Sequence, residues 1–350
     1  MENRLEFKPK CMLLTGAVGF IGSHVLDTAV DAFPDCQFVV LDIMDPTCAT
    51  LKNIEKPLAS GRCKLVVGSI ESYDLVRHLF SEHQFDSVIH LAALTHVDLS
   101  LVNSLDFTRV NVTGTHVLLE CMREYNNRCN KNGAKPLQKI IIISTDEVVA
   151  HDVDIPLKED CTFRCSNPYA GTKAGAEILS QSYRLSFGLN IIVTRGNNVL
   201  GTRQSLNKVL PKFVTCALQD KPITIHGDGL QRRSFMDVQD TADALICILR
   251  HGKVGHIYNI GTEREYTVLE LAKLILHRLG KDDSSIVHCV DRAIQDRRYL
   301  IDSSKLRSLG WAPKRPIEDH IGDYISWYRQ NYANYWDVNI SPMLEAHPRV

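Results

Sequence analysis

The sequence has little net charge and no long apolar run, and both absences exclude whole classes of protein. Its 350 residues carry 40 Lys and Arg against 41 Asp and Glu, so no excess of positive charge predicts binding to nucleic acid or to an anionic membrane. No hydrophobic stretch approaches the roughly 20 residues that a membrane-spanning helix needs. The opening MENRLEFKPK does not resemble a signal peptide. We therefore expect a cytoplasmic protein with no nucleic-acid or membrane partner.

The cysteines form no metal or disulfide pattern. There are 11 of them, and an odd number scattered along a chain of this size fits reduced, mostly buried thiols better than a disulfide framework. Cys161 and Cys165 are close in sequence, but no second cysteine pair or histidine pair accompanies them. The sequence therefore predicts no zinc site and no other metal.

Short β-branched runs alternate with amphipathic stretches through most of the chain. The runs are almost continuously hydrophobic, as expected for strands of a parallel sheet that is covered on both faces. The predicted strands are Cys11–Leu14, Gln37–Leu41, Cys63–Val67, Ser87–Ala92, Lys139–Ser144 and Asn190–Thr194. Repeated β-α units of this kind predict an α/β protein with a Rossmann-like, doubly wound parallel sheet.

The segment LLTGAVGFIGSHV places Gly16, Gly19 and Gly22 between the first predicted strand and the next helix. Glycines there permit a tight turn and a close approach to a pyrophosphate, although a turn can need glycine for structural reasons alone. The helix N-terminus adds free N–H groups for the phosphates. Asp42 ends the next strand, where a carboxylate would bind a ribose 2′-hydroxyl. No Lys or Arg follows it directly in LDIMD, so the sequence predicts NAD rather than NADP. The predicted cofactor turn also includes Phe20 and Ile21.

Two further motifs carry groups suited to proton transfer. Tyr169 and Lys173 in NPYAGTKAGAE are four residues apart, which places them on one face of a helix. A nearby ammonium lowers the pKa of a phenol and makes the phenolate accessible as a base. Asp146 and Glu147 in STDE follow an apolar strand directly. Adjacent carboxylates resist burial unless they have a function.

After about Thr194 the alternation loosens, and turn-rich pieces such as GHIYNIGTE separate helices near 208–218, 238–251 and 267–279. We predict an NAD-binding Rossmann domain with the catalytic residues over 9–195. A smaller, mainly substrate-binding lobe over 196–335 would be interleaved with it and cover the carboxyl edge of its sheet. Residues 1–8 and 336–350 would form tails.

Together these motifs resemble those of the extended short-chain dehydrogenase/reductase family. The segments that carry the resemblance are TGAVGFIG, HLAALTHVD, STDEV, NPYAGTK and YNIG. Within that family, STDE with LTHVDLS and VDRAIQDRRYLID is similar to the dTDP-glucose 4,6-dehydratases. The resemblance extends from about Met12 to Tyr332 and implies bound NAD, a nucleotide-diphosphate sugar substrate and a homodimer.

The resemblance also implies a mechanism that uses both acidic residues. Tyr169 would take the proton of the sugar's C4 hydroxyl as hydride leaves C4 for NAD⁺, with Lys173 holding the nicotinamide ribose and Thr145 binding the reacting hydroxyl. Glu147 would then remove the C5 proton, and protonated Asp146 would give its proton to the departing C6 hydroxyl. Hydride would finally return to C6, and the product of dTDP-glucose or UDP-glucose would be the 4-keto-6-deoxy sugar nucleotide.

Further contacts are implied by position in the family's motifs. Those to the cofactor are Ser69, Ile70, Ala92, Ala93 and Thr95. Those to the sugar nucleotide are Asp98, Ser100, Asn198, Lys208, Arg233, Asn259 and Arg292. Asn111 would support the active-site backbone or belong to a structural polar network.

The chain departs from the family pattern without losing a proton-transfer group. Val149 and Ala150 replace the usual tyrosine and glycine after STDEV, and Leu200 and Thr202 replace the aromatic residue and proline of NNYGP. We expect these changes to reshape the walls of the pocket. Three alternatives stay open: a UDP-glucuronate decarboxylase, a hexose 4-epimerase, and a regulatory protein that binds NAD and sugar nucleotides without turnover. An epimerase needs no acid pair, and a decarboxylase of this type usually has serine at position 146.

Overall fold

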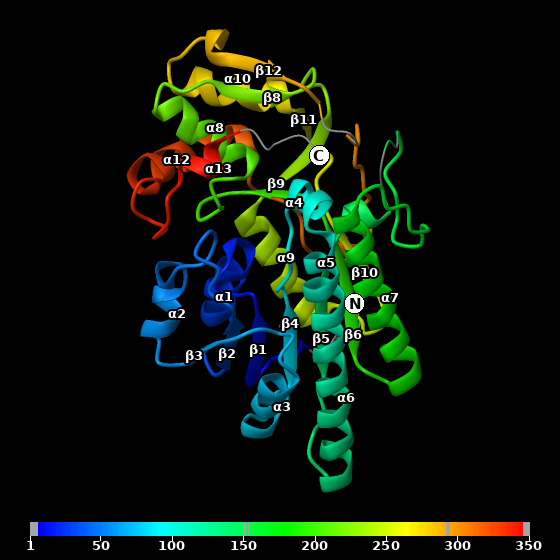
Figure 1. Ribbon diagram of the computed structural model, residues 1–350. Helices are drawn as coiled ribbons and strands as arrows, with labels where there is room; N and C mark the ends of the chain where they lie inside the picture. The colour runs from blue at the N-terminus through cyan, green and yellow to red at the C-terminus, as the bar shows by residue number, and fades with distance from the viewer. Residues whose placement is uncertain (1–5, 150–151, 153, 292–294, 346–350) are drawn as a thin grey trace.

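The structure is a computed structural model that describes residues 6–149, 152, 154–291 and 295–345 (Figure 1). Its largest element is a parallel sheet of seven strands in the order β10-β6-β5-β4-β1-β2-β3. Their bounds are β1 Cys11–Thr15, β2 Gln37–Asp42, β3 Cys63–Val67, β4 Ser87–His90, β5 Lys139–Thr145, β6 Ile191–Gly196 and β10 Ile257–Ile260. The six predicted strands and the doubly wound architecture are therefore confirmed.

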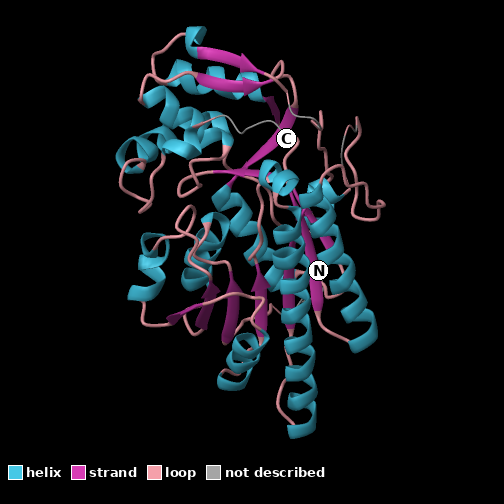
Figure 2. Cartoon of the chain, in the orientation of Figure 1, coloured by secondary structure: helices cyan, strands magenta, loops and turns pink. Residues whose placement is uncertain are grey.

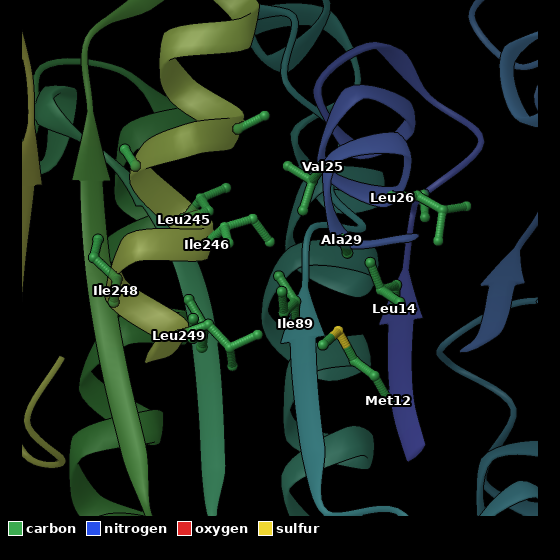
Figure 3. Packing of buried hydrophobic residues seen from close by; sticks show 14 of the residues in the cluster. Met12, Leu14, Val25, Leu26, Ala29, Ile89, Leu245, Ile246, Ile248 and Leu249 are labelled. Carbon is green, nitrogen blue, oxygen red and sulfur yellow. The ribbon is translucent and has the colours of Figure 1, made fainter. Parts of the chain in front are cut away.

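Helices cover both faces of this sheet, which explains why its strands are hydrophobic at successive positions. On one face, α1 (Phe20–Ala32) and α9 (Val238–His251) pack over Met12 and Leu14 of β1 and Ile89 of β4 (Figure 3). On the other face, Leu13 of β1 faces the cluster that includes α3 (Tyr73–Glu82), α6 (Thr115–Asn132) and α7 (Pro168–Phe187).

The second half of the chain builds a smaller lobe with its own hydrophobic core. It contains a sheet of β7 (Asn198–Leu200), β9 (Arg232–Asp237) and β11 (Glu265–Thr267), and a pair formed by β8 (Ile223–His226) and β12 (Ile286–Cys289). Its helices are α8 (Val209–Leu218), α10 (Val268–Arg278), α12 (Ile317–Asn331) and α13 (Ser341–Leu344). The lobe lies beyond the carboxyl ends of the large sheet (Figure 2).

Short helical segments complete the chain. They are η1 (Leu51–Ile54), α2 (Glu55–Ala59), α4 (Val97–Val102), α5 (Ser104–Phe107), the π-helical η2 (Thr108–Gly114), η3 (Asp146–Val148), η4 (Asp283–Ser285) and α11 (Ser304–Arg307). Among the residues with described positions, no helix is both long and apolar enough to cross a membrane.

Two features modify the predicted organisation. The segment GHIYNIGTE, predicted as turn-rich, contains β10, which joins the large sheet beside β6. Trp336 and Leu344, placed in a predicted tail, are buried in the core of the smaller lobe, and Phe7 packs against the core of the large sheet. The division at residue 195 stays a prediction.

Candidate active site

The glycine turn after β1 leaves no space for side chains at two of its positions. Gly16 has a φ of +70°, and a Cβ there would lie 2.6 Å from the backbone nitrogen of Ala92. A Cβ on Gly22 would lie 2.4 Å from the carbonyl oxygen of Gly16. Gly19 caps α1 without a side-chain hydrogen bond, so no side chain of its own competes for the N–H groups of the first turn. This backbone cradle at a helix N-terminus fits a pyrophosphate.

Asp42 holds the cradle from the end of β2. Its Oδ2 accepts a hydrogen bond from the Val18 N–H at 2.9 Å, and its Oδ1 accepts one from the Met44 N–H at 2.9 Å. The side chain is largely buried, and burial raises its pKa. Each carboxylate oxygen retains a second lone pair for a ribose hydroxyl. Phe20 and Ile21 follow the cradle as the first residues of α1.

The other predicted cofactor residues lie along the carboxyl edge of the sheet, after β3 and β4. Ser69 donates to Glu71 Oε2 at 3.1 Å, and the buried Ile70 packs against Gly114 of η2. Ala92 touches the glycine turn, and the carbonyl of Thr95 accepts a hydrogen bond from Lys208 Nζ at 3.1 Å.

Asn111 fixes the backbone between Ala93 and Thr95. Its Oδ1 accepts from the Leu94 N–H at 2.8 Å, and its Nδ2 donates to the Leu94 carbonyl at 2.9 Å. Nδ2 also donates to Thr172 Oγ1 of α7 at 3.0 Å. These bonds fit both roles predicted for Asn111, support of the active-site backbone and membership of a structural polar network, and the choice between them stays a prediction.

Asp146 lies in η3, directly after β5, and is 1% exposed. Asn197 Nδ2 donates to its Oδ2 at 2.7 Å, and Thr145 Oγ1 lies 3.2 Å from its Oδ1. Burial, together with the negative charge of Glu147, raises the pKa of Asp146 to about 7. An aspartic acid that keeps its proton near neutral pH can act as a general acid.

Glu147 has a different environment. Asn167 Nδ2 donates to its Oε2 at 3.2 Å. Burial raises the pKa of Glu147, whereas the Asn167 bond and the positive charges of Arg233 and Lys208 oppose this shift. The two carboxyl groups are thus adjacent in sequence but held by different partners.

Tyr169 and Lys173 lie on α7 beside the acid pair, and both are about nine-tenths buried. Burial and the charges of Glu147 and Asp146 raise the pKa of the Tyr169 phenol, and a hydrogen bond with Thr145 opposes this effect. Lys173 Nζ donates to the Ile143 carbonyl at 2.6 Å, and burial lowers its pKa to about 8. We expected Lys173 to lower the pKa of Tyr169, but this effect is absent here. The Lys173 ammonium faces the Ile143 carbonyl instead.

A second polar cluster lies on the side of the smaller lobe. Asp296 accepts hydrogen bonds from Ser166 Oγ at 2.5 Å and from the Tyr299 hydroxyl. Arg233 stacks over the Tyr299 ring at 4.5 Å and donates to the Asp296 carbonyl at 2.8 Å. Because Arg233 acts on the pKa of both Asp146 and Glu147, it brings positive charge to the acid pair.

Some of the predicted substrate contacts form hydrogen bonds with other parts of the chain. Ser100 is fully buried, and its hydroxyl accepts from the Tyr169 N–H at 3.2 Å while it donates to the Val97 carbonyl. Asn259 is also fully buried, and its Nδ2 donates to the carbonyls of Leu157 and Asp302. Asp98 is 6% exposed, and Asn198 begins β7. Substrate contact by these residues stays a prediction, and Arg292 lies outside the described residues.

Two of the departures from the family pattern lie in hydrophobic clusters. Val149 packs with Tyr299 and Ile301, and Leu200 belongs to the core of the smaller lobe. The Thr202 carbonyl bonds with His24 Nε2 at 3.2 Å, and Ala150 lies outside the described residues. Val149 and Leu200 are therefore buried packing residues, and the predicted reshaping of the pocket walls stays a prediction.

Asn167 and Asn197, the amide partners of the acid pair, were not predicted from the sequence. A polar residue directly after a parallel strand was the available signal for Asn197, which follows β6. Within the described part of the chain, no group of three or more His, Cys, Asp or Glu side chains could hold a metal ion.

Comparison with known proteins identifies relatives along nearly the whole chain. A family model described as GDP-mannose 4,6 dehydratase matches residues 13–324. The chain is 42% identical over 348 residues to a trifunctional UDP-glucose 4,6-dehydratase/UDP-4-keto-6-deoxy-D-glucose 3,5-epimerase/UDP-4-keto-L-rhamnose-reductase of Arabidopsis thaliana, covering 98% of this chain and 50% of that protein. It is 38% identical over 345 residues to the dTDP-D-glucose 4,6-dehydratase of Homo sapiens, covering 97% of this chain and 95% of that protein. The chain thus spans about half the length of the plant relatives.

Solved structures agree with these matches. A dTDP-glucose 4,6-dehydratase from Streptomyces venezuelae, solved with NAD bound, is similar with a TM-score of 0.87 and 31% identity, covering 95% of this chain and 99% of that chain. A UDP-glucose 4-epimerase from Thermotoga maritima is similar with a TM-score of 0.82 and 27% identity, covering 92% and 99%. The predicted Rossmann-like fold and family resemblance are confirmed, and the chain belongs to the GDP-mannose 4,6-dehydratase family.

Proposed function

We propose that the chain is an NAD-dependent lyase that converts dTDP-glucose or UDP-glucose to the 4-keto-6-deoxy sugar nucleotide and water. One observation carries this proposal: Asp146 and Glu147 lie side by side beside Tyr169, and the pKa of Asp146 is raised to about 7. Elimination needs an acid and a base at the same time, and this pair can provide both. The names of the plant and human relatives support the same reaction.

The glycine cradle and Asp42 fit NAD, since the turn has no space for side chains where a pyrophosphate would lie. Ser69, Ile70, Ala92, Ala93 and Thr95 would extend the site along the sheet edge. Bound NAD would supply an acceptor for the hydride that leaves C4, a donor of hydride to C6, and a positive charge in its oxidised form. Such a positive charge would make the buried phenol of Tyr169 a better base.

The chain's own residues perform the proton transfers. Tyr169 Oη takes the proton of the C4 hydroxyl, and Thr145 orients that hydroxyl. The resulting C4 ketone acidifies C5, where the Glu147 carboxylate removes a proton. Asp146 then donates its proton to the C6 hydroxyl, which leaves as water. Glu147 gives a solvent-exchanged proton back to C5 when C6 receives hydride. Lys173 stays fixed by the Ile143 carbonyl at the base of the site.

The acid pair also favours the dehydratase reaction over the three alternative functions. A 4-epimerase has no elimination step and would not need a protonated aspartate. A decarboxylase would lose CO₂ from C5 and would not need an acid for C6. A regulatory protein without turnover would have no use for a buried carboxyl that keeps its proton near neutral pH, which costs stability at alkaline pH.

We further propose a homodimer in the cytoplasm. Support for the dimer comes from Ile178 and Leu185, which lie seven residues apart on one side of α7 and are each at least half exposed. Support for the compartment comes from the cysteines, all 11 of which are free. Light scattering at micromolar concentration tests the dimer, and a clean monomer would contradict it.

Turnover is tested by incubation of the purified protein with NAD and either sugar nucleotide, followed by NMR and mass spectrometry. We expect a 4-keto-6-deoxy product, and the faster substrate identifies the preferred base. Asp146→Asn and Glu147→Gln should each slow product formation at least about 100-fold, the usual contribution of a general acid or base. Glu82→Gln, on the exposed end of α3, is the control and should leave the rate unchanged.

A further inference from the structure

We propose that Asn197 is a positioning residue that confines the proton of Asp146 to Oδ1, and that the backbone N–H of Thr262 imposes this by fixing the side-chain amide of Asn197. The inference rests on the proposed function, because it concerns the acid of the elimination step. Asn197 is assigned a positioning role because it acts through Asp146, to which its side chain donates a hydrogen bond.

The hydrogen bonds of Asn197 determine which way its amide points. Its Oδ1 accepts a hydrogen bond from the Thr262 N–H at 3.1 Å. A backbone N–H can only donate, so the amide oxygen must face Thr262 and the NH₂ group must face Asp146. The bond from Asn197 Nδ2 to Asp146 Oδ2, at 2.7 Å, follows from this orientation.

Asn197 Nδ2 already donates a proton toward Asp146 Oδ2. A second proton, bound to Oδ2 and pointing at the same amide, would clash with it. A protonated Asp146 therefore carries its proton on Oδ1. Thr145 Oγ1 donates to this oxygen at 3.2 Å when Asp146 is ionised. Because a hydroxyl can also accept, it can instead take a hydrogen bond from a proton on Oδ1, which the amide N–H of Asn197 cannot do at Oδ2. Thr145 also bonds with Tyr169. The acidic proton is thus held on the side of the carboxyl group where the residues of the oxidation step are found.

Packing holds the Asn197 side chain in place, and the Thr262 N–H selects the orientation of its amide. The side chain is 6% exposed, and its own backbone N–H donates to the Ile260 carbonyl at 3.0 Å. A Cβ on Gly261 would lie 2.5 Å from Asn197 Oδ1. The turn after β10 therefore closes directly over the amide oxygen and places the Thr262 N–H against it.

The charge of the Asp146 carboxylate predicts how its pKa changes when the Asn197 donor is removed. A hydrogen bond donated to a carboxylate stabilises its ionised form, and the Asn197 bond opposes the burial that raises the pKa of Asp146. Removal of this donor should raise the pKa of Asp146 further. One hydrogen bond to a charged group corresponds to about one to two pH units.

The test uses two variants of the full-length protein. Asn197→Asp has the same shape but presents an acceptor to Asp146, and Asn197→Leu removes the polar group. The ionisation of Asp146 is followed by carbon-13 NMR of labelled aspartate, with Asp146→Asn identifying the signal. This readout needs no turnover. Thermal unfolding and circular dichroism confirm that each variant folds.

We expect both variants to shift the titration of Asp146 upward by about one to two pH units. In single turnover, C4 oxidation, seen as NADH absorbance, should keep its rate, and water loss should slow about 10- to 100-fold. An unchanged titration in two folded variants would overturn the inference even if the wild type makes product. A shifted titration without product from the wild type would instead overturn the proposed function and leave the positioning role intact.

Discussion

Asn167 donates its side-chain amide to Glu147 Oε2 at 3.2 Å, and the same side chain caps the helix that carries Tyr169. Its Oδ1 accepts a hydrogen bond from the Ala170 N–H at 2.9 Å. One residue thus joins the base of the elimination step to the helix of the oxidation step. The two functions can be separated by substitution, because aspartate also caps helices but cannot donate to a carboxylate.

Asn167→Ala should lower the free energy of unfolding by about 1 kcal/mol through loss of the cap and should also slow product formation. Asn167→Asp should keep most of the stability but slow the reaction, since a second negative charge would lie against Glu147. Chemical denaturation and steady-state rates check both results. The capping role would be refuted by an alanine variant that is as stable as the wild type.

The raised pKa of Asp146 predicts how stability depends on pH. The pKa is about 7 in the folded state, whereas the ordinary value for an aspartate is 3.8, so the folded state binds the proton more tightly between these two values. The contribution of this group to stability is fully present below the unfolded pKa and is lost as the pH rises through about 7.

Asp146→Asn should therefore stabilise the protein more at pH 8 than at pH 5, by about 2–3 kcal/mol. Denaturant unfolding at the two pH values measures the difference. The exposed Asp35→Asn is the control and should change stability little at either pH. Equal effects of Asp146→Asn at both pH values would show that Asp146 is ionised in the folded protein at pH 5.

A buried ion pair connects β6, the strand before Asn197, to α7, the helix that carries Lys173. Arg195 of β6 and Glu177 of α7 are 2.6 Å apart, with side chains 3% and 1% exposed. Arg195→Met should destabilise the fold by about 3–5 kcal/mol, because it leaves the Glu177 charge buried alone. The double variant Glu177→Leu, Arg195→Met should cost clearly less than the sum of the two single changes. A double-mutant cycle measures the coupling, and strict additivity would contradict it.

The glycine cradle predicts a selective loss of NAD binding. Gly16→Ala places a methyl group against the backbone of Ala92 at a positive φ, so the turn must shift and NAD affinity should fall at least about tenfold. Gly322→Ala in α12, where a Cβ meets nothing within 4 Å, should leave NAD binding intact and raise stability by about 0.5–1 kcal/mol. Calorimetric titration with NAD checks both variants. Equal affinity in Gly16→Ala would contradict the assigned site.

The sequence was sufficient to predict the six strands, because each is a short, almost continuously apolar run. It did not identify β10, whose four residues are enclosed by the turn-forming GHIYNIGTE and become a strand only by pairing with β6. Local pattern is a weak guide where tertiary pairing decides.

The same limit applies to the site. Tyr169, Lys173 and the acid pair were predicted from spacing and from the end of a strand, and the structure brings them together. The contact between Lys173 and the Ile143 carbonyl could not be predicted, since it depends on how α7 packs over β5. The partnership of Asn197 with Asp146 joins the ends of β5 and β6 and also depends on a turn 65 residues further along the chain.

The central claim is that Glu147 and Asp146 perform an elimination across C5 and C6 of a glucose nucleotide. The most direct measurement is incubation with dTDP-glucose and UDP-glucose in deuterated water, followed by NMR of the sugar. We predict a 4-keto-6-deoxy product with deuterium at C5, because the proton removed there is replaced from solvent. A product with unexchanged hydrogen at C5, or no conversion of either sugar by protein that binds NAD, would contradict the claim.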